Sequence, residues 1–156
     1  MKKVFVSGCF DILHGGHVEF FNQAKSLGDY LIVSFASDEV LWDYKYKKPS
    51  MPEEHKLSLI SSLRMVDEVV IGDDLDNIGL EFEKHFAESN ANILAVTKDD
   101  SFSDLKKQLC EKYSAEYVVL DKNLSYKQTS TSNIIKTILA PKEAPLRVDF
   151  AGGWLD

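Results

Sequence analysis

Short apolar runs alternate along the chain with longer segments whose apolar residues recur at helical spacing. The runs predict strands at residues 4–7, 30–35, 67–71, 93–96 and 117–120. The longer segments predict helices at residues 16–27, 53–65, 78–89, 104–113 and 132–139. Continuous apolar runs are typical of a parallel sheet that helices cover on both sides. The pattern therefore predicts an α/β fold, a doubly wound (Rossmann-like) five-stranded parallel sheet with helices on both faces.

The pattern changes near the end of the chain. Residues 1–139 of the 156 carry the alternating elements and suffice for one domain with a buried core. Pro141 and Pro145 then stop the last predicted helix. A new apolar run begins at Leu146 and ends in Gly152-Gly153. Residues 140–156 are therefore interpreted as a linker followed by the first strand of a further domain.

Composition restricts the class of protein. Apolar residues make up 44% and charged residues 28% of the chain, as in ordinary soluble globular proteins. No apolar run approaches the length of a membrane span, and the N-terminus does not read as a signal peptide. Cys9 and Cys110 are too few for a disulfide framework or a cysteine-based metal site. We therefore expect a cytoplasmic protein without a membrane partner and assign no metal ligands.

The charge balance argues against one large class of partner. With a net charge of −7, the chain does not resemble a general nucleic-acid-binding protein, which would normally be basic. Chemistry on phosphates would instead require a locally positive pocket. A candidate source of that charge is the cluster Lys45, Lys47 and Lys48, followed by His55, Lys56 and Arg64, although such a lysine cluster is more often a solvated surface loop.

The ten residues from Gly8 to His17 lie where the first predicted strand gives way to the first helix. The junction places His14 and His17 at a helix N-terminus, where backbone N–H groups and the helix dipole favour anions. Gly15 and Gly16 between them let a ligand approach the backbone closely. Ligands of doubly wound sheets bind beyond the carboxyl ends of the strands, so motif and fold predict the same nucleotide-phosphate site. The absence of G-x-G-x-x-G argues against a dinucleotide oxidoreductase.

Gly8-Cys9-Phe10-Asp11, followed by His14-x-Gly16-His17, resembles the signature of the cytidylyltransferase-like nucleotidyltransferases. Glycerol-3-phosphate cytidylyltransferases and heptose-phosphate adenylyltransferases belong to this family. The resemblance implies transfer of a nucleotidyl group from ATP or CTP to a phosphorylated sugar or polyol, with release of pyrophosphate. The acceptor phosphate is already anionic, so catalysis needs positioning and charge stabilisation rather than a base. The resemblance also implies Mg²⁺ with the triphosphate and a homodimer.

The resemblance assigns roles to residues along most of the chain. It gives catalysis to His14, His17 and Lys47, and binding of the acceptor substrate to Asp38, Lys45 and Lys48. The residues expected to bind the nucleotide are Gly8, Cys9, Phe10, Asp11, Gly16, Arg64, Asp99, Asp100, Ser130, Thr131 and Ser132.

Several of these residues have a second interpretation. Arg64 fits a helix C-terminal cation as well as a nucleotide contact, and Cys9 fits a small buried residue behind the motif. The hydroxyls of residues 130–132 can cap the last helix and also hold a phosphate. Trp42 and Tyr44 could stack on a base or line the acceptor pocket, although aromatic residues in such positions more often serve packing.

The chain departs from the family pattern at two positions. Lys98 stands where the family usually has a glycine before its acidic pair, which affects the contact expected of Asp99 and Asp100. Ser125 stands where the cytidylyltransferases have an arginine, and Lys122 or Lys127 could replace that arginine only as a point charge.

These residues do not determine the identity of the acceptor substrate. Residues 144–156 resemble the opening strand and glycine turn of sugar kinases of the galactokinase and mevalonate kinase superfamily. The resemblance favours fusion to a sugar kinase domain, and the alternative is a β-extension unrelated to the kinases. That resemblance favours a sugar phosphate, such as a heptose 1-phosphate, as acceptor. The alternatives are a cytidylyltransferase for glycerol 3-phosphate or another alcohol phosphate, and a nucleotide-binding module without catalysis.

Overall fold

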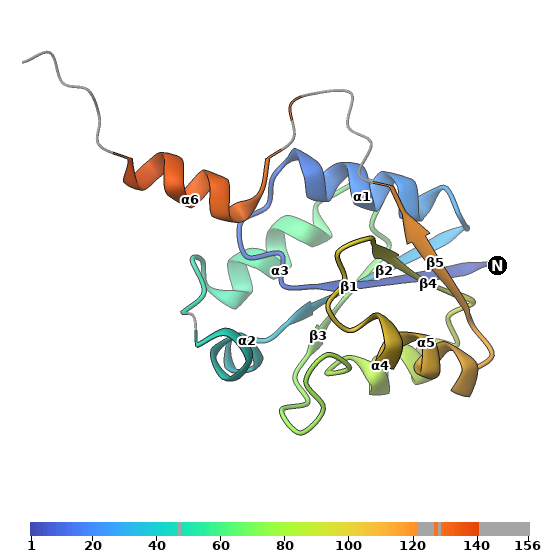
Figure 1. The fold of residues 1–156 in the computed structure, drawn as a ribbon. Helices are drawn as coiled ribbons and strands as arrows, with labels where there is room; N and C mark the ends of the chain where they lie inside the picture. Colours follow the sequence, from blue (N-terminus) through green and yellow to red (C-terminus); the bar gives the residue numbers. More distant parts are fainter. Residues whose placement is uncertain (47, 122–126, 128, 141–156) are drawn as a thin grey trace, which may run out of the picture.

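Residues 1–46, 48–121, 127 and 129–140 are described by the structure, which is a computed structural model. Within them, one all-parallel sheet contains β1 (Lys3–Gly8), β2 (Tyr30–Ala36), β3 (Glu68–Gly72), β4 (Ile93–Thr97) and β5 (Glu116–Leu120), in the order β3-β2-β1-β4-β5. The predicted doubly wound parallel sheet is confirmed (Figure 1). None of the described helices is long and apolar enough to cross a membrane.

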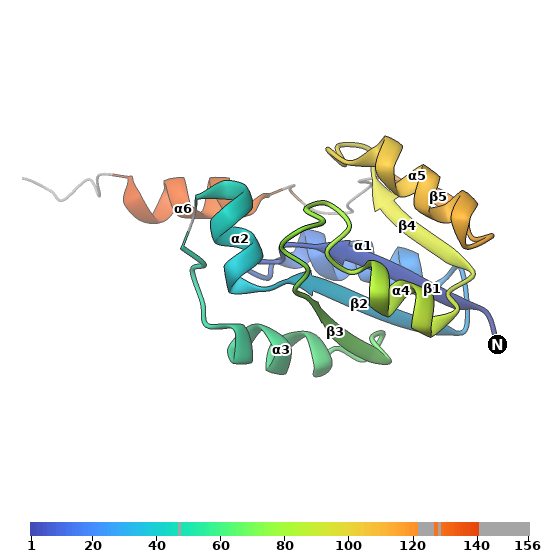
Figure 2. The same cartoon turned by 90° about the horizontal axis from the view of Figure 1, so that it is seen from below.

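Six helices accompany the strands within the described residues. They are α1 (Gly15–Lys25), α2 (Asp38–Lys45), α3 (Glu53–Ser61), α4 (Glu83–Ser89), α5 (Ser103–Lys112) and α6 (Thr131–Leu139). Figure 1 shows α1 and α3 on one face of the sheet and α4 and α5 on the other, as the continuous apolar strands predict. Figure 2 shows α2 and α6 beyond the sheet, at the carboxyl ends of its strands.

The core consists of two apolar layers, one on each side of the central strand. On one side, Val4 and Val6 of β1 pack with Phe21 of α1 and Ile60 of α3, all with no exposed surface. On the other side, Phe5 packs with the fully buried Phe82 and with residues of α4 and α5. Cys110 belongs to this second layer, where burial raises the pKa of its thiol to about 11. Such a cysteine acts as a small apolar residue.

The helix predictions differ from the structure at three places. Helix α2 was not predicted, because its sequence DEVLWDYK carries too few apolar residues to show a clear face. Helix α3 ends at Ser61, where the hydroxyls of Ser61 and Ser62 bond back to carbonyls in the preceding turn and compete with the helix. Residues 78–82 are not helical, since Gly79 has φ +92° and interrupts the pattern before α4.

The sheet order creates one crevice at the centre of its carboxyl edge. The central strand β1 pairs with β2 on one side and with β4 on the other, so the chain leaves this point in two directions. The connections after β1 and after β4 run to opposite faces of the sheet, and the space between these two loops can hold a ligand. The segment after Gly8 and the segment after Thr97 therefore border the same space. The strand expected in residues 144–156 lies outside the described residues.

Candidate active site

A cavity of about 680 Å³ opens at this crevice. Its walls come from the ends of β1 and β4, the starts of α1 and α6, the inner side of α2 and the loop between β3 and α4. Of the predicted site residues, the structure brings the following to this cavity: Gly8, Cys9, Phe10, Asp11, His14, Gly16, His17, Asp99, Asp100, Ser130, Thr131 and Ser132. A volume of this size is typical of sites for small molecules and cofactors.

The two histidines form the N-terminal cap of α1. Nδ1 of His14 accepts the backbone N–H of Gly16 at 3.1 Å, and Nδ1 of His17 accepts the backbone N–H of His14 at 3.4 Å. The two imidazoles stack, with ring centroids 3.9 Å apart and planes inclined by 27°. Gly16 is required in this turn because a Cβ atom there would come within 2.9 Å of the His14 ring.

This cap determines where each imidazole carries its proton. A ring nitrogen that accepts an N–H bond has no proton of its own, so the proton of each neutral imidazole lies on Nε2. Both histidines are therefore fixed as Nε2–H donors, and both line the cavity. Two donors beside a helix N-terminus can stabilise negative charge on a phosphate.

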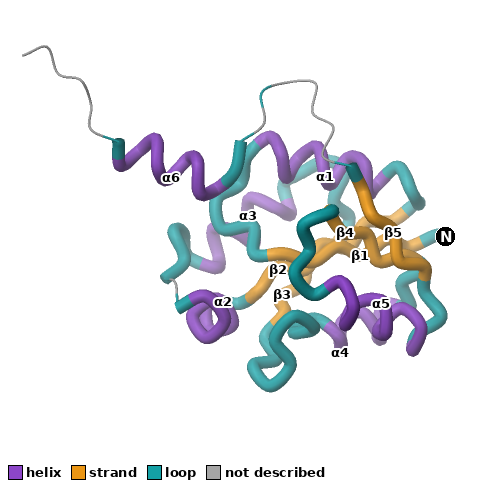
Figure 3. The backbone as a smooth tube through the Cα atoms, in the orientation of Figure 1, coloured by secondary structure: helices purple, strands orange, loops and turns teal. Residues whose placement is uncertain are grey.

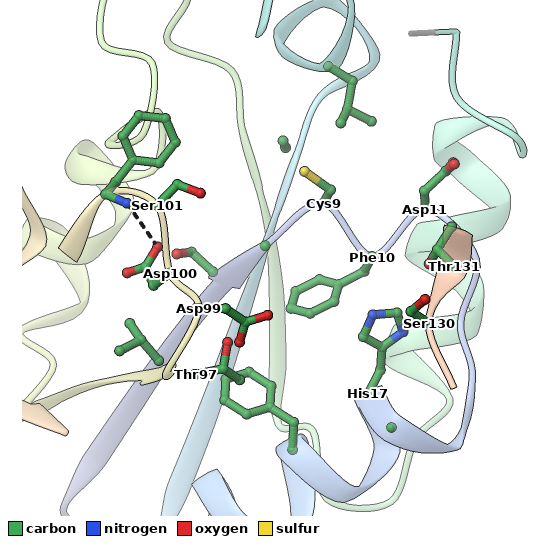
Figure 4. A pocket seen from close by; sticks show the side chains of 18 of the residues that line it. Cys9, Phe10, Asp11, His17, Thr97, Asp99, Asp100, Ser101, Ser130 and Thr131 are labelled. Carbon is green, nitrogen blue, oxygen red and sulfur yellow. Dashed lines mark hydrogen bonds between the residues drawn. The ribbon is translucent and has the colours of Figure 1, made fainter. Parts of the chain in front are cut away.

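The Phe10 ring packs between His17 and the apolar core. The backbone of Phe10 is left-handed, with φ +44°, a conformation that non-glycine residues rarely adopt. The turn directs the Phe10 ring edge-on to His17, at 5.2 Å between centroids, and to Phe21 in the core, at 5.0 Å. Figure 4 shows the Phe10 ring between His17 and Asp99. Phe10 therefore connects the cap of α1 to the apolar core.

Asp11 holds a neighbouring segment of chain. Its carboxylate accepts the backbone N–H and the hydroxyl of Ser50, each at 2.7 Å. The fully buried Lys56 donates through Nζ to the carbonyl of Cys9 at 3.2 Å. Burial lowers the pKa of Lys56, while the carboxylates of Asp11 and Asp38 oppose that shift. These contacts tie the segment before α3 to the turn that carries the histidines.

The structure describes only part of the lysine cluster Lys45, Lys47 and Lys48. Lys47 lies outside the described residues, and of Lys45 only the backbone, at the end of α2, is described. Lys48 is exposed and does not line the cavity, although its neighbour Pro49 does. Asp38 also lies away from the cavity; burial and the nearby Glu53 raise the pKa of its carboxyl group, and Lys56 opposes them.

The acidic pair after β4 divides into two roles. Asp100 accepts from Lys106 at 2.9 Å and from the backbone of Phe102 at 3.3 Å, both through Oδ1. Its Oδ2 atom is buried and has no hydrogen-bond partner among the described residues. A buried carboxylate oxygen without a donor is costly, and a hydroxyl or amine of a bound ligand would satisfy it. Asp99 is exposed and lies on the same side of the cavity (Figure 4).

The start of α6 faces the cavity opposite this acidic pair. The Ser130 hydroxyl accepts the Asn133 N–H at 3.2 Å and caps the helix, while Thr131 donates to the carbonyl of Ile12 at 3.5 Å. Figure 3 shows the start of α6 beside the start of α1. Two helix N-termini therefore border the cavity, an arrangement that favours the binding of phosphates.

A family model described as cytidylyltransferase-like matches residues 5–137. The chain belongs to the cytidylyltransferase-like family. The FAD synthase of Ferroglobus placidus is 34% identical over 151 residues, which cover 94% of this chain and 94% of that protein. The FAD synthase of Thermococcus onnurineus is 38% identical over 141 residues, covering 88% of this chain and 91% of that protein. The protein is thus a nucleotidyltransferase of this family.

Solved structures show the same fold for this cytidylyltransferase-like chain. A lipopolysaccharide core biosynthesis protein of Thermoplasma volcanium superposes with a TM-score of 0.65 at 29% identity, covering 81% of this chain and 99% of that one. The pantoate-β-alanine ligase of Francisella tularensis superposes with a TM-score of 0.59 at 19% identity, covering 84% of this chain and 61% of that one. The ligase shares the fold alone.

The departures of this chain from the cytidylyltransferase-like pattern have separate structural settings. Lys98, in place of the usual glycine, is exposed and pairs with Asp121 beyond β5. Arg64 is exposed in the turn after α3 and is not brought to the cavity. Lys127 is exposed, whereas Lys122 and Ser125 lie outside the described residues. The roles expected of Arg64 and Lys127 stay predictions.

The burial of two lysines and the positions of two apolar residues at the site of this cytidylyltransferase-like chain were not expected from the sequence. Lys56, which the sequence includes among the candidate cations, and Lys106 are buried, and Phe102 and Ile78 line the cavity. The burial of the two lysines could have been predicted from their positions on apolar helix faces, where Lys56 lies with Ile60 and Lys106 lies with Leu109. Among the described residues, no group of three or more metal-ligating side chains comes together.

Proposed function

We propose that this nucleotidyltransferase joins the adenylyl group of ATP to the phosphate of FMN, forming FAD and pyrophosphate. The observation that carries the proposal is the pair of Nε2–H donors of His14 and His17 beside two helix N-termini in one cavity. The name of the acceptor comes from the relatives: FAD synthases match this chain at 34% and 38% identity over most of its length.

In the proposed reaction, an oxygen of the FMN phosphate attacks the α-phosphorus of ATP. The bond from that phosphorus to the bridging oxygen breaks, and pyrophosphate leaves with the electron pair. No proton has to be removed from the attacking oxygen, so His14 and His17 serve as donors to the charge that develops on the phosphates. ATP would enter as its Mg²⁺ complex, because Mg²⁺ in such sites is held largely by substrate phosphates.

The remaining contacts of the proposal follow the geometry of the cavity. The starts of α1 and α6 would hold the triphosphate, with the Ser130 and Thr131 hydroxyls beside it. The buried Oδ2 of Asp100 would accept from a hydroxyl or amine of the nucleoside. Lys47 stays the predicted additional cation, and Asp38, Lys45 and Lys48 stay predictions for the acceptor.

A sugar phosphate is the second candidate acceptor. The likeness to the lipopolysaccharide core biosynthesis protein, at 29% identity over 81% of this chain, favours it. CTP is the second candidate donor. The expected homodimer and the fusion to a sugar kinase stay predictions as well.

The test is a matrix of the purified protein with ATP or CTP against FMN, heptose 1-phosphate and glycerol 3-phosphate. Pyrophosphate release is measured in every combination, and FAD is identified by chromatography. We expect turnover with ATP and FMN, at least about tenfold above any other pair, a difference equivalent to ~1.4 kcal/mol. Preferred turnover of a sugar or polyol phosphate would overturn the assignment of FMN. Nucleotide binding without turnover of any pair would leave a binding module.

A further inference from the structure

One wall of the cavity is apolar, in contrast to the polar ends of α1 and α6. It consists of Val40, Leu41 and Tyr44 of α2, Ile78 from the loop before α4, and Phe102 from the turn before α5. Val40 and Leu41 are nearly fully buried and form a small core with Ala36, against which Ile78 packs. We call these five residues the apolar wall.

Tyr44 and Phe102 form the aromatic part of the apolar wall. Their ring centroids lie 5.3 Å apart with the planes inclined by 55°. The Phe102 ring rests against the backbone of Gly79, where a Cβ atom would meet the ring at 2.5 Å and where φ is +92°. Phe102 is therefore held in place by its contact with Gly79. Tyr44 has 38% of its surface exposed and forms the solvent-exposed end of the apolar wall.

The position of Tyr44 is specific to one side of its helix. Trp42, two residues earlier on α2, is 55% exposed and does not line this cavity. It borders a separate surface depression with Asp38, Glu39, Asp43 and Leu75. The fold thus separates two neighbouring aromatic residues that the sequence does not distinguish.

We propose that the apolar wall holds the flat ring system of the acceptor, the isoalloxazine of FMN, with Tyr44 as the stacking residue. The inference rests on the proposed function. A triphosphate would gain nothing from an apolar surface, and the hydroxyls of a sugar phosphate would lose hydrogen bonds to water there. A tricyclic aromatic ring gains both apolar burial and stacking.

The apolar wall is built from both halves of the sheet. Helix α2 and the loop with Ile78 follow β2 and β3, whereas Phe102 follows β4, directly after the Asp99-Asp100 pair. The histidines, which follow the central strand β1, line the same cavity as the wall. A ring on the apolar wall would therefore share one cavity with the Nε2–H donors of His14 and His17, which its phosphate must reach.

The test compares Y44A, Y44F and Y44L with the matched control W42A in the full chain. FMN binding is followed by quenching of flavin fluorescence, and KM values for FMN and ATP are measured separately. We expect Y44A to raise the Kd and KM for FMN about tenfold or more, as loss of one stacking partner does, with the KM for ATP unchanged within about twofold. We expect Y44F to match the wild type, Y44L to lose most of the quenching, and W42A to leave all constants unchanged.

Each outcome decides between the two proposals. If the wild type forms FAD but Y44A and W42A show the same constants for FMN, the apolar wall is not the flavin site and the proposed function stands. If Y44A raises the KM for ATP instead, the wall holds the base of the donor and the inference is wrong. If the wild type neither binds FMN nor forms FAD, both proposals fall. Equal thermal melting of Y44A and W42A excludes unfolding as the cause.

Discussion

Helices α1 and α6 both present their N-termini to the cavity, but they are held in different ways. Helix α1 buries Phe21 and Ala24 in the core, and its cap is made by two imidazoles that also line the cavity. Helix α6 has no buried side chain, extends away from the sheet (Figure 1), and begins at a single serine cap. One helix start is therefore rigid and the other depends on a few contacts.

This difference matters for catalysis. Stabilising a transition state requires donors that are already in place, because moving them during the reaction would cost free energy. His14 and His17 meet this requirement, since backbone bonds fix their rings and Phe10 connects them to the core. The hydroxyls of Ser130 and Thr131 are better suited to binding the triphosphate than to stabilising charge at the reacting phosphorus.

The largest expected difference is in stability. Phe21→Ala should lower the free energy of unfolding by about 3–5 kcal/mol, because it opens a cavity in a fully buried layer. Ile138→Ala on α6 should cost less than about 1 kcal/mol, since that side chain is 66% exposed. Urea unfolding of both variants measures the two values. A cost for Ile138→Ala close to that of Phe21→Ala would show that the Ile138 side chain is buried in solution.

The next effect is on turnover. His17→Asn keeps an acceptor near the position of Nδ1, so the cap of α1 and the melting temperature should persist, but it removes the Nε2–H donor. Turnover should fall about 10²–10³-fold, as for loss of one preorganised donor. His55→Asn, on the exposed side of α3, is the control and should leave turnover unchanged. Turnover of His17→Asn at the wild-type rate would remove His17 from catalysis.

The smallest effect concerns the cap of α6. Ser130→Ala should destabilise the helix by about 1 kcal/mol, seen as faster hydrogen exchange of the Asn133 amide, which Ser130 accepts. Ser130→Asp keeps a capping oxygen and should keep that protection, but its charge should raise the KM for ATP because it faces the triphosphate. An unchanged KM in Ser130→Asp would show that the start of α6 does not bind phosphate.

Local signals were sufficient for most of the fold. The apolar runs located every strand of the described sheet. In β1, β2 and β4 the runs are continuous because the central residues of these strands are buried. The helical spacing of apolar residues failed to predict α2, whose side chains are mostly polar. It also wrongly predicted a helix over residues 78–82, where one glycine interrupts the pattern. Both segments border the cavity.

The sequence by itself determined the parallel sheet, the junction that carries His14 and His17, and the resemblance to the nucleotidyltransferases, because each depends on residues close together in the chain. Only the tertiary structure decided that Asp11 binds Ser50, that Arg64 lies away from the cavity, and that Tyr44 lines it while Trp42 does not. These facts depend on how helices and loops distant in sequence pack around the central strand. Local spacing carries no record of that packing.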